Sequence, residues 1–170
     1  MADRGATHLE LFRKRRWKVA GSNERIPFFT CARPGRSLSS TGPVPDAIVH
    51  KWVKGQPGPN TTIVSLLGKK PTNEMSEFSF YSFHGQLDTN TRRKPSWQAW
   101  LDKHHKDRNI HVVEHPTIDF QPIPAAKLAR IAEDITRLLA ERTIVLVDSG
   151  GQTRTGTVCA HLSLTEDTRS

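Results

Sequence analysis

The most informative stretch of the chain is Thr143-Ile144-Val145-Leu146-Val147-Asp148-Ser149-Gly150-Gly151-Gln152-Thr153-Arg154-Thr155-Gly156. It begins with a run of β-branched and aliphatic residues, which is typical of a strand buried on both faces of a parallel sheet. A glycine-rich turn follows, and residues 157–164 then have the pattern of a helix. A turn between a buried strand and a helix directs backbone N–H groups at one point, where the helix N-terminus also favours negative charge. We therefore expect an oxyanion such as phosphate to bind at this turn.

The segments before this turn indicate strands that alternate with helices. Apolar residues recur at helical spacing over residues 125–142, directly after Pro124, a residue that is favoured at a helix start. Further strands are expected over residues 61–67, 78–83 and 110–113, and shorter helices over residues 47–53 and 97–106. This alternation predicts an α/β fold with a central, mostly parallel sheet that is flanked by helices.

Several residues of the turn are suited to hold the expected anion. The candidate phosphate-binding residues are Ser149, Gly150, Gly151, Gln152, Thr153 and Arg154. We call residues 148–155 the cradle. Its two glycines permit backbone angles that other residues rarely adopt. The guanidinium of Arg154 can donate two parallel hydrogen bonds to a phosphate, and a structural salt bridge is the alternative role for this residue.

The cradle resembles the phosphate-binding loop of the cysteine-dependent protein tyrosine and dual-specificity phosphatases. The loop of that superfamily has the pattern His-Cys-x-x-Gly-x-x-Arg-Ser/Thr-Gly, which Gly151, Arg154, Thr155 and Gly156 match. The resemblance extends over about residues 28–165. It implies a phosphatase-like fold in which a strand, a phosphate-binding loop and a helix follow one another.

The resemblance also implies roles for individual residues. Residues 115–122 are similar to the loop that carries the general acid of the superfamily, so Asp119 would protonate the leaving oxygen. Arg154 would hold the equatorial oxygens of the phosphate, and the hydroxyl of Thr155 would assist the second step of the reaction. An Asx turn is the alternative role for Asp119.

The centre of the cradle departs from the superfamily, because Asp148 stands at the position of the nucleophilic cysteine and Val147 at that of the histidine. An ionised carboxylate there repels phosphate and can pair with Arg154, so we expect a pseudophosphatase with impaired or absent turnover. The alternative is an active phosphatase, acting on phosphate monoesters of protein, RNA or phosphoinositide, with Asp148 or water as nucleophile. Phosphorylation of a carboxylate generally uses a metal ion, and no acidic cluster is apparent, so we expect neither a metal nor a cofactor.

The charge of the chain indicates a class of partner. Its 170 residues include 25 Lys and Arg against 17 Asp and Glu, which gives a formal net charge of +8 and favours polyanions. The sequence predicts a basic N-terminal arm over residues 1–25, followed by a single domain over residues 26–170. The residues expected to contact a polyanion are Arg13, Lys14, Arg15, Arg16 and Lys18. A solvated basic segment without a partner is the alternative.

The remaining features of the sequence indicate the cellular compartment. No apolar run approaches the roughly 18 residues of a membrane span, and the first residues lack the apolar stretch of a secretory signal. The two cysteines, Cys31 and Cys159, lie far apart, which favours a reducing, cytoplasmic compartment. Three functional classes remain: a module that binds a phosphorylated protein or another phosphate-bearing ligand, an unusual phosphatase, and a basic nucleic-acid-associated protein.

Overall fold

The structure is a computed structural model that describes residues 14–36, 43–69, 76–83 and 96–169. Within these ranges the chain forms six strands, four α-helices and the short 3-10 helix η1 (Lys106–Arg108). The strands are β1 (Arg15–Val19), β2 (Arg25–Ala32), β3 (Thr61–Ser65), β4 (His111–Glu114), β5 (Thr143–Asp148) and β6 (Leu164–Glu166). The helices are α2 (Asp46–Lys54), α3 (Trp97–His104), α4 (Ala125–Leu138) and α5 (Thr153–His161).

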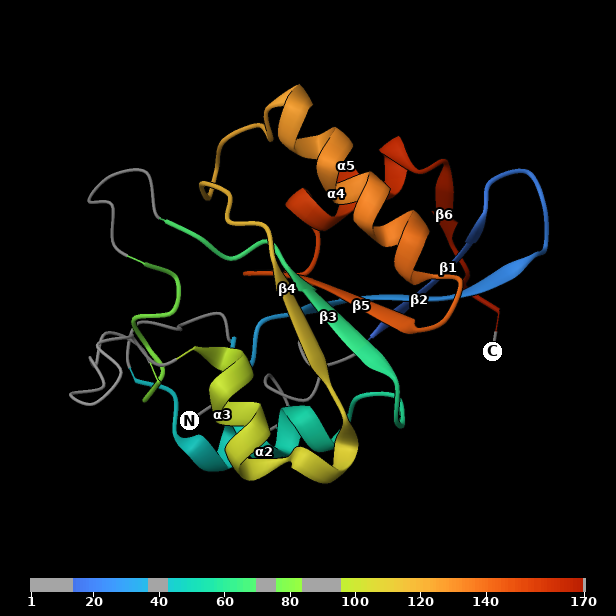
Figure 1. The fold of residues 1–170 in the computed structure, drawn as a ribbon. Coiled ribbons are helices and arrows are strands. Elements are labelled where there is room, and N and C mark those ends of the chain that lie inside the picture. The colour runs from blue at the N-terminus through green and yellow to red at the C-terminus, as the bar shows by residue number, and fades with distance from the viewer. Residues whose placement is uncertain (1–13, 37–42, 70–75, 84–95, 170) are drawn as a thin grey trace, which may run out of the picture.

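The sheet has the strand order β4-β3-β5-β2-β1-β6. The pairs β4–β3, β3–β5 and β5–β2 are parallel, whereas β1 pairs antiparallel with both β2 and β6. Helices cover both faces of this sheet (Figure 1), so the expected α/β fold with a mostly parallel sheet is confirmed. Because β5 lies between β3 and β2, the cradle that follows it leaves from the middle of the sheet, where the carboxyl ends of parallel strands meet.

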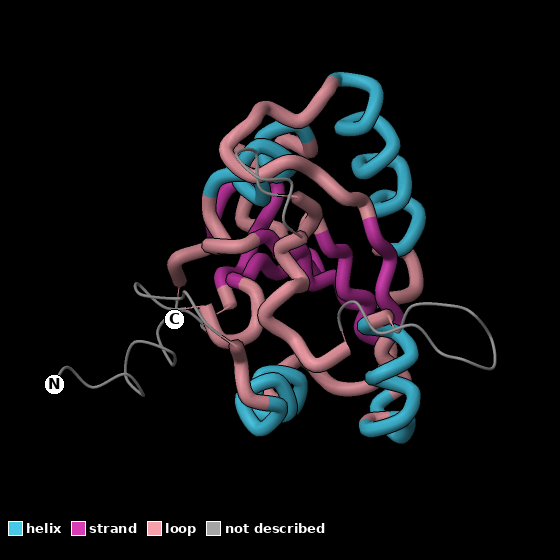
Figure 2. The backbone as a smooth tube through the Cα atoms, turned by 90° about the vertical axis from the view of Figure 1, so that its left-hand side faces the viewer, coloured by secondary structure: helices cyan, strands magenta, loops and turns pink. Residues whose placement is uncertain are grey.

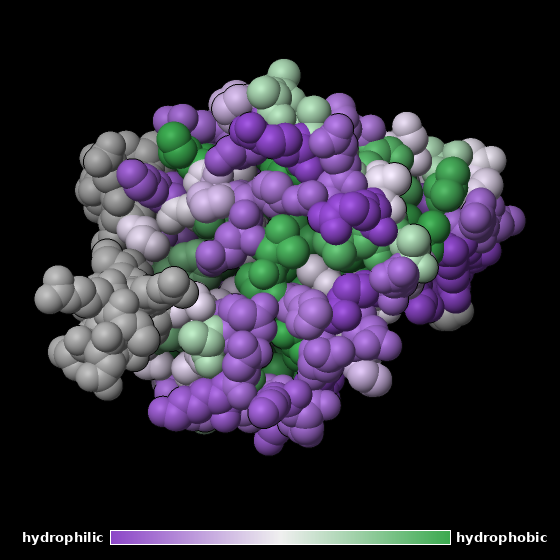
Figure 3. Space-filling model, in the orientation of Figure 1, coloured by the Kyte–Doolittle hydropathy of each residue, from purple (hydrophilic) through white to green (hydrophobic). Residues whose placement is uncertain are grey.

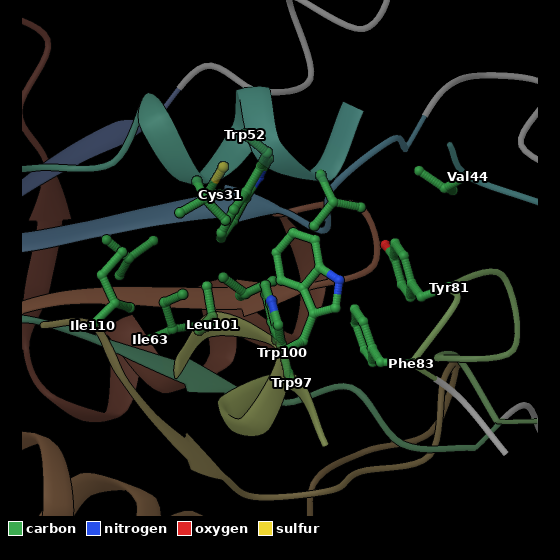
Figure 4. Packing of buried hydrophobic residues seen from close by; sticks show 14 residues of the cluster. Cys31, Val44, Trp52, Ile63, Tyr81, Phe83, Trp97, Trp100, Leu101 and Ile110 are labelled. Carbon is green, nitrogen blue, oxygen red and sulfur yellow. The ribbon is translucent and has the colours of Figure 1, made fainter. Parts of the chain in front are cut away.

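Two hydrophobic cores lie on the two faces of the sheet, which forms a layer between the helices (Figure 2). Under α4 and α5, the side chains of Ile131 and Ile135 are completely buried. The core under α2 and α3 is rich in aromatic residues, with the rings of Trp52 and Trp97 5.4 Å apart and Trp100 beside them (Figure 4). On the face that Figure 3 shows, hydrophilic side chains cover most of the surface and hydrophobic ones show in the hollows between them.

Most of the predicted helices and strands are present close to their expected positions. The helices expected over residues 47–53, 97–106 and 125–142 correspond to α2, α3 and α4, and the strands expected over residues 61–67, 110–113 and 143–147 correspond to β3, β4 and β5. The helix expected over residues 157–164 begins earlier, at Thr153, and the chain enters β6 at Leu164. The strands β1, β2 and β6 were not predicted.

The strand predicted over residues 78–83 is wrong, because these residues form consecutive turns. Backbone N–H groups of Ser79 and Tyr81 bond to the carbonyls of Ser76 and Phe78, which closes the chain on itself. The alternating aromatic residues that suggested a strand instead pack together, and the rings of Tyr81 and Phe83 stack with centroids 5.3 Å apart. Packing against the aromatic core therefore outweighed the period-two pattern.

The basic segment near the N-terminus also departs from the expectation of an arm over residues 1–25, because residues 15–19 form β1 inside the sheet. The Trp17 side chain is 6% exposed and its indole N–H donates to the Thr30 hydroxyl, 2.9 Å away. Because Trp17 lies within a run of cations, its burial is hidden from a reading of charge alone. Arg13 lies outside the described residues.

Both cysteines lie in the cores of the protein. Cys31 and Cys159 form no disulfide bond among the described residues, and each is only 1% exposed. Burial raises the pKa of the Cys31 thiol to about 11 and that of Cys159 to about 12, so neither thiol ionises readily near neutral pH.

Among the described helices, none is long and apolar enough to cross a membrane.

Candidate anion-binding site

A cavity of about 690 Å³ opens where β5 ends and α5 begins. It is bounded by the cradle on one side and by residues 119–123, which connect β4 to α4, on the other. The cradle residues that line it are Asp148, Ser149, Gly150, Gln152, Thr153 and Arg154. Asp119 lines the same cavity and lies 3.3 Å from the Arg154 guanidinium, so the structure brings the loop that resembles a general-acid loop to the cradle.

The backbone of the cradle requires glycine at one position. Gly151 has φ +73, and a Cβ atom there would lie 2.6 Å from the backbone nitrogen of Ala32 in β2. The end of β2 thus lies directly against the cradle. Just after β2, the Arg33 N–H donates to the Asp148 carbonyl at 2.9 Å. By contrast, a Cβ atom at Gly150 would meet open space. Gly151 therefore shapes the loop, whereas Gly150 lines the cavity.

Asp148 turns its carboxylate into the cradle. The residue is 2% exposed, and one carboxylate oxygen accepts the Thr155 N–H at 2.9 Å. The other oxygen accepts the Gly151 N–H. Among the described residues, Asp148 thus bonds to backbone donors rather than to Arg154, the pairing that the sequence favoured. The carboxylate thus accepts hydrogen bonds from N–H groups at the start of α5, where an external anion would otherwise accept them.

Arg154 is 4% exposed and is held by a second carboxylate. Its guanidinium makes a bidentate ion pair with Glu77, with N···O distances of 2.8 and 2.7 Å. The same guanidinium donates to the Thr117 hydroxyl at 2.9 Å and to the Leu66 carbonyl at 3.2 Å. Arg154 therefore has the structural salt bridge that was the alternative role, while its side chain also lines the cavity.

The charges around Arg154 keep it positive despite its burial. Burial alone would lower its pKa, but the hydrogen-bonded charge of Glu77, followed by those of Asp148 and Asp119, raises that pKa above its ordinary value. The Asp119 carboxylate lies 3.3 Å from the guanidinium, farther away than that of Glu77 at 2.7 Å. The Asp119 carboxylate also accepts the N–H of Phe120, a residue that has φ +62 and is 85% exposed.

The hydroxyl groups of the cradle differ in their surroundings. Thr155 is completely buried, and its hydroxyl has no hydrogen-bond partner among the described residues. The hydroxyl of Ser149 accepts the Nε–H of Arg33 at 3.4 Å. Gln152 and Thr153 are exposed at the start of α5 and face the cavity. The cradle therefore combines buried groups beneath the anion position with exposed groups at its rim.

Sequence reasoning missed the residues that hold Arg154 in place. Glu77 is 1% exposed, and one of its carboxylate oxygens also accepts the Gly68 N–H at 2.9 Å. A Cβ atom at Gly68 would lie 2.0 Å from the Thr117 carbonyl oxygen, so this close approach requires glycine. No local motif marks these residues, because Glu77 precedes an aromatic run that suggested only a strand. Arg36 also lines the cavity and belongs to residues 33–36, which resemble the entry loop of the superfamily only loosely.

The described basic residues near the N-terminus make separate contacts within the fold. Arg15 donates to Glu166 at 2.9 Å and to the cradle carbonyl of Gly151 at 3.3 Å, whereas Lys14 bonds to the Gly55 carbonyl. Lys18 donates to a carbonyl of its own turn, that of Ser22, at 2.7 Å. The guanidinium of Arg16 lies 5.2 Å from the centre of the Phe29 ring.

The fold is similar to a known phosphatase structure. The crystal structure of kinase associated phosphatase (KAP), with its catalytic-site cysteine substituted by serine, superposes with a TM-score of 0.51 and 18% sequence identity. The match covers 88% of this chain and 71% of that one. A likeness at this identity shows that the chain has a phosphatase-like fold. Neither a protein-family model nor a curated protein sequence matches the chain.

Proposed function

We propose that the chain is a phosphatase-like module that binds a phosphorylated protein or another phosphate-bearing ligand and has impaired or absent turnover. The observation that carries this proposal is the Asp148 carboxylate, whose two oxygens accept the N–H groups of Gly151 and Thr155 inside the cradle. In the superfamily that the cradle resembles, a cysteine thiolate would stand at this position. The carboxylate therefore takes the place of the nucleophile and uses donors that would otherwise face phosphate.

The geometry supports a site that binds an anion in competition with its own carboxylate. A phosphate that approaches the cradle meets the negative charge of Asp148 in a partly dry environment, where repulsion is stronger than in water. The positive end of α5 and the guanidinium of Arg154 attract the same phosphate. The balance favours weak binding, with Asp148 as the residue that limits affinity.

The walls of the cavity support a ligand that is larger than a phosphate ion. Its volume of about 690 Å³ is within the range of sites for drug-sized ligands. Opposite the cradle, Phe120 and Ile123 provide apolar surface. A phosphate group carried on a larger molecule would place the phosphate at the cradle and its remaining atoms along this wall.

The experiment is a calorimetric titration with phosphate and with vanadate. Asp148→Asn should bind both anions more tightly than the wild type, by roughly 1–3 kcal/mol before screening by solvent, since one unit of repulsion is lost. Asp102→Asn, which removes the same charge from an exposed position on α3, is the matched control and should leave affinity unchanged. Equal affinities for the wild type and Asp148→Asn would overturn the proposal that Asp148 blocks the cradle.

Turnover is tested separately with aryl phosphate. Asp148→Cys should raise hydrolysis above that of the wild type, because it restores the nucleophile of the superfamily that the cradle resembles. Val147 is completely buried in the aromatic core, so Val147→His should be added only after Asp148→Cys has been measured alone. Hydrolysis by the wild type that is lost in Asp148→Asn would instead favour an active phosphatase with Asp148 as nucleophile.

A further inference from the structure

Another cavity, of about 460 Å³, is lined by residues that precede the strands β3 and β4, whereas the cradle follows the end of β5. Its lining residues, which we call the histidine pocket, are His50, Lys54, His104, His105, Asp107 and Arg108. They belong to α2, α3 and η1, apart from His105, which lies between α3 and η1; these helices precede β3 and β4. The pocket is therefore near the edge of the sheet where these strands begin. None of its lining residues also lines the cavity at the cradle.

Two imidazole rings are hydrogen-bonded across this pocket. The Nδ1 atom of His50 lies 2.7 Å from the Nε2 atom of His105, so one ring donates and the other must be neutral in order to accept. Both rings pack on Trp100, with centroid distances of 4.7 Å for His50 and 5.6 Å for His105. Trp100 also contacts His104, at 4.9 Å. The imidazoles are thus held in place by packing as well as by their mutual bond.

Permanent positive charges border the same pocket. Lys54 and Arg108 line it, and Asp107 is the one carboxylate among its described lining residues. Arg108 uses Nη2 to hold the Gln56 carbonyl at 2.8 Å, but its Nε atom is buried with no hydrogen-bond partner among the described residues. The carbonyl of Trp52 at the end of α2, which would repel an anion, already accepts the Gln56 amide at 2.9 Å.

The imidazoles and the charges of the histidine pocket together indicate which class of ligand it can bind. The pocket is net positive, because two permanent cations, Lys54 and Arg108, line it against one carboxylate, Asp107. Burial lowers the pKa of His105 most, and the charges of Lys54 and Arg108 lower it further, whereas Asp107 raises it. The described residues include no group of three ligands suited to a metal ion, and two permanent cations would repel one. An oxyanion would offset the positive potential. It would also favour protonation of the rings, which turns their acceptor nitrogens into additional donors.

We propose that the histidine pocket is a second oxyanion site, which binds a phosphate-type anion together with uptake of protons by its imidazoles. Each ring that becomes charged takes one proton from the solvent. Once both rings are charged, neither can accept, and the hydrogen bond between His50 and His105 opens. Lys54 and the two rings donate to the bound anion. This inference does not depend on the function proposed for the cradle, because the two sites share no residue.

Sulfate is the suitable probe, because it stays doubly charged over the range in which imidazoles titrate, so that any pH dependence comes from the protein. Calorimetry at about pH 6 and about pH 8 should show about fivefold tighter binding at the lower pH. Titrations in two buffers that differ in ionisation enthalpy should show net proton uptake. The ring C–H signals of His50 and His105 should shift in proton NMR spectra, which separates this site from the cradle.

Variants on α2 identify the site. Lys54→Gln should weaken sulfate binding by about tenfold, as expected from the loss of one charge-assisted hydrogen bond. Lys51→Gln is the matched control, because Lys51 is exposed in the same turn of α2 but does not line the pocket. His50→Gln should reduce the proton uptake, because one of the two hydrogen-bonded imidazoles is then missing. Both lysine variants change exposed side chains, so their folding is not at risk.

Competition experiments distinguish the sources of the anion. Displacement of sulfate by glycerol phosphate as well as by inorganic phosphate would show that the site accepts an esterified phosphate, and displacement by inorganic phosphate alone would restrict the ligand to a free ion. Equal sulfate binding by Lys54→Gln and Lys51→Gln, or binding without proton uptake, would overturn the proposal. If the histidine signals move but the Asp148→Asn titration fails, only the function proposed for the cradle is lost.

Discussion

Arg154 shows how much a single side chain depends on its neighbours. Among the described ion pairs, its pair with Glu77 is the most deeply buried, with side-chain exposures of 5% and 1%. A buried pair need not stabilise a protein relative to apolar residues, but removal of one partner leaves an uncompensated charge in a dry environment. At this site the pair also orients the guanidinium at the base of the cavity.

Glu77→Ala should therefore lower the free energy of unfolding by about 3–5 kcal/mol, as is typical when one partner of a buried ion pair is removed. The control is Glu166→Ala, which removes a carboxylate that is 37% exposed and paired with Arg15, and which should change stability by about 1 kcal/mol or less. Urea denaturation of both variants tests the difference. Similar losses would contradict a structural role for the buried pair.

Gly151 is the second residue whose substitution we expect to have a large effect on stability. Gly151→Ala should destabilise the protein by at least about 1 kcal/mol, because the residue has φ +73 and its Cβ atom would meet the backbone of β2. Gly150→Ala is the matched control and should be nearly neutral, since its Cβ atom would enter open space. Thermal melts of the two variants provide the measurement, and equal melting temperatures would contradict this view of the cradle.

At the scale of elements, β1 shows that a basic segment can also be a structural strand. Trp17 points to the core under α4 and α5, whereas the side chain of Arg16 points to the other face of the sheet, where it lies over Phe29. The strand pairs with β2 on one side and β6 on the other. Its contribution to folding is therefore independent of any polyanion that its cations contact.

Trp17→Ala should lower the free energy of unfolding by about 3–5 kcal/mol, the usual effect when a buried aromatic side chain is truncated. Arg16→Ala, one position away on the exposed face, should change it by less than about 1 kcal/mol. Guanidinium denaturation followed by circular dichroism compares the two. A small effect of Trp17→Ala would restore the hypothesis that residues 1–25 form an arm outside the core.

For the whole molecule, the histidine pocket links stability to pH. The lowered pKa of His105 means that the folded protein keeps this ring neutral at a pH where the unfolded chain, with an ordinary pKa of about 6.5, has begun to take up a proton. The unfolded state then binds more protons, and stability must rise with pH in this range. The charged residues that line the pocket with the rings are Lys54 and Arg108, which lower the pKa of His105, and Asp107, which raises it.

The melting temperature should therefore be highest above about pH 6.5 and should fall as the pH is lowered through that value, then level off below the pKa of the folded state. His105→Asn should flatten this dependence, and His161→Asn, on α5 and outside the pocket, should not. Tryptophan fluorescence can follow the melts, because Trp100 packs on the histidines. The same pH profile in His105→Asn would contradict the assignment.

Local sequence was sufficient to predict the centre of this protein. The strand and the turn of residues 143–152 follow from short-range properties, a β-branched run and a pair of glycines. The helix after them was also expected, although it begins at Thr153 rather than at residue 157. Helices α2, α3 and α4 followed in the same way, because apolar periodicity and helix-start signals act within a few residues. The cavity at the cradle was also foreseeable, since a turn after a buried parallel strand opens at the carboxyl edge of the sheet.

Tertiary packing determined the rest, because the interactions concerned join distant parts of the chain. Arg154 and Glu77 are 77 residues apart in sequence, and no local pattern marks them as partners. The placement of β1 between β2 and β6 depends on the burial of Trp17, which is invisible in a run of charges. Asp148 could be recognised as unusual from its position alone, but the direction of its carboxylate depended on where the folded loop placed the N–H groups of Gly151 and Thr155.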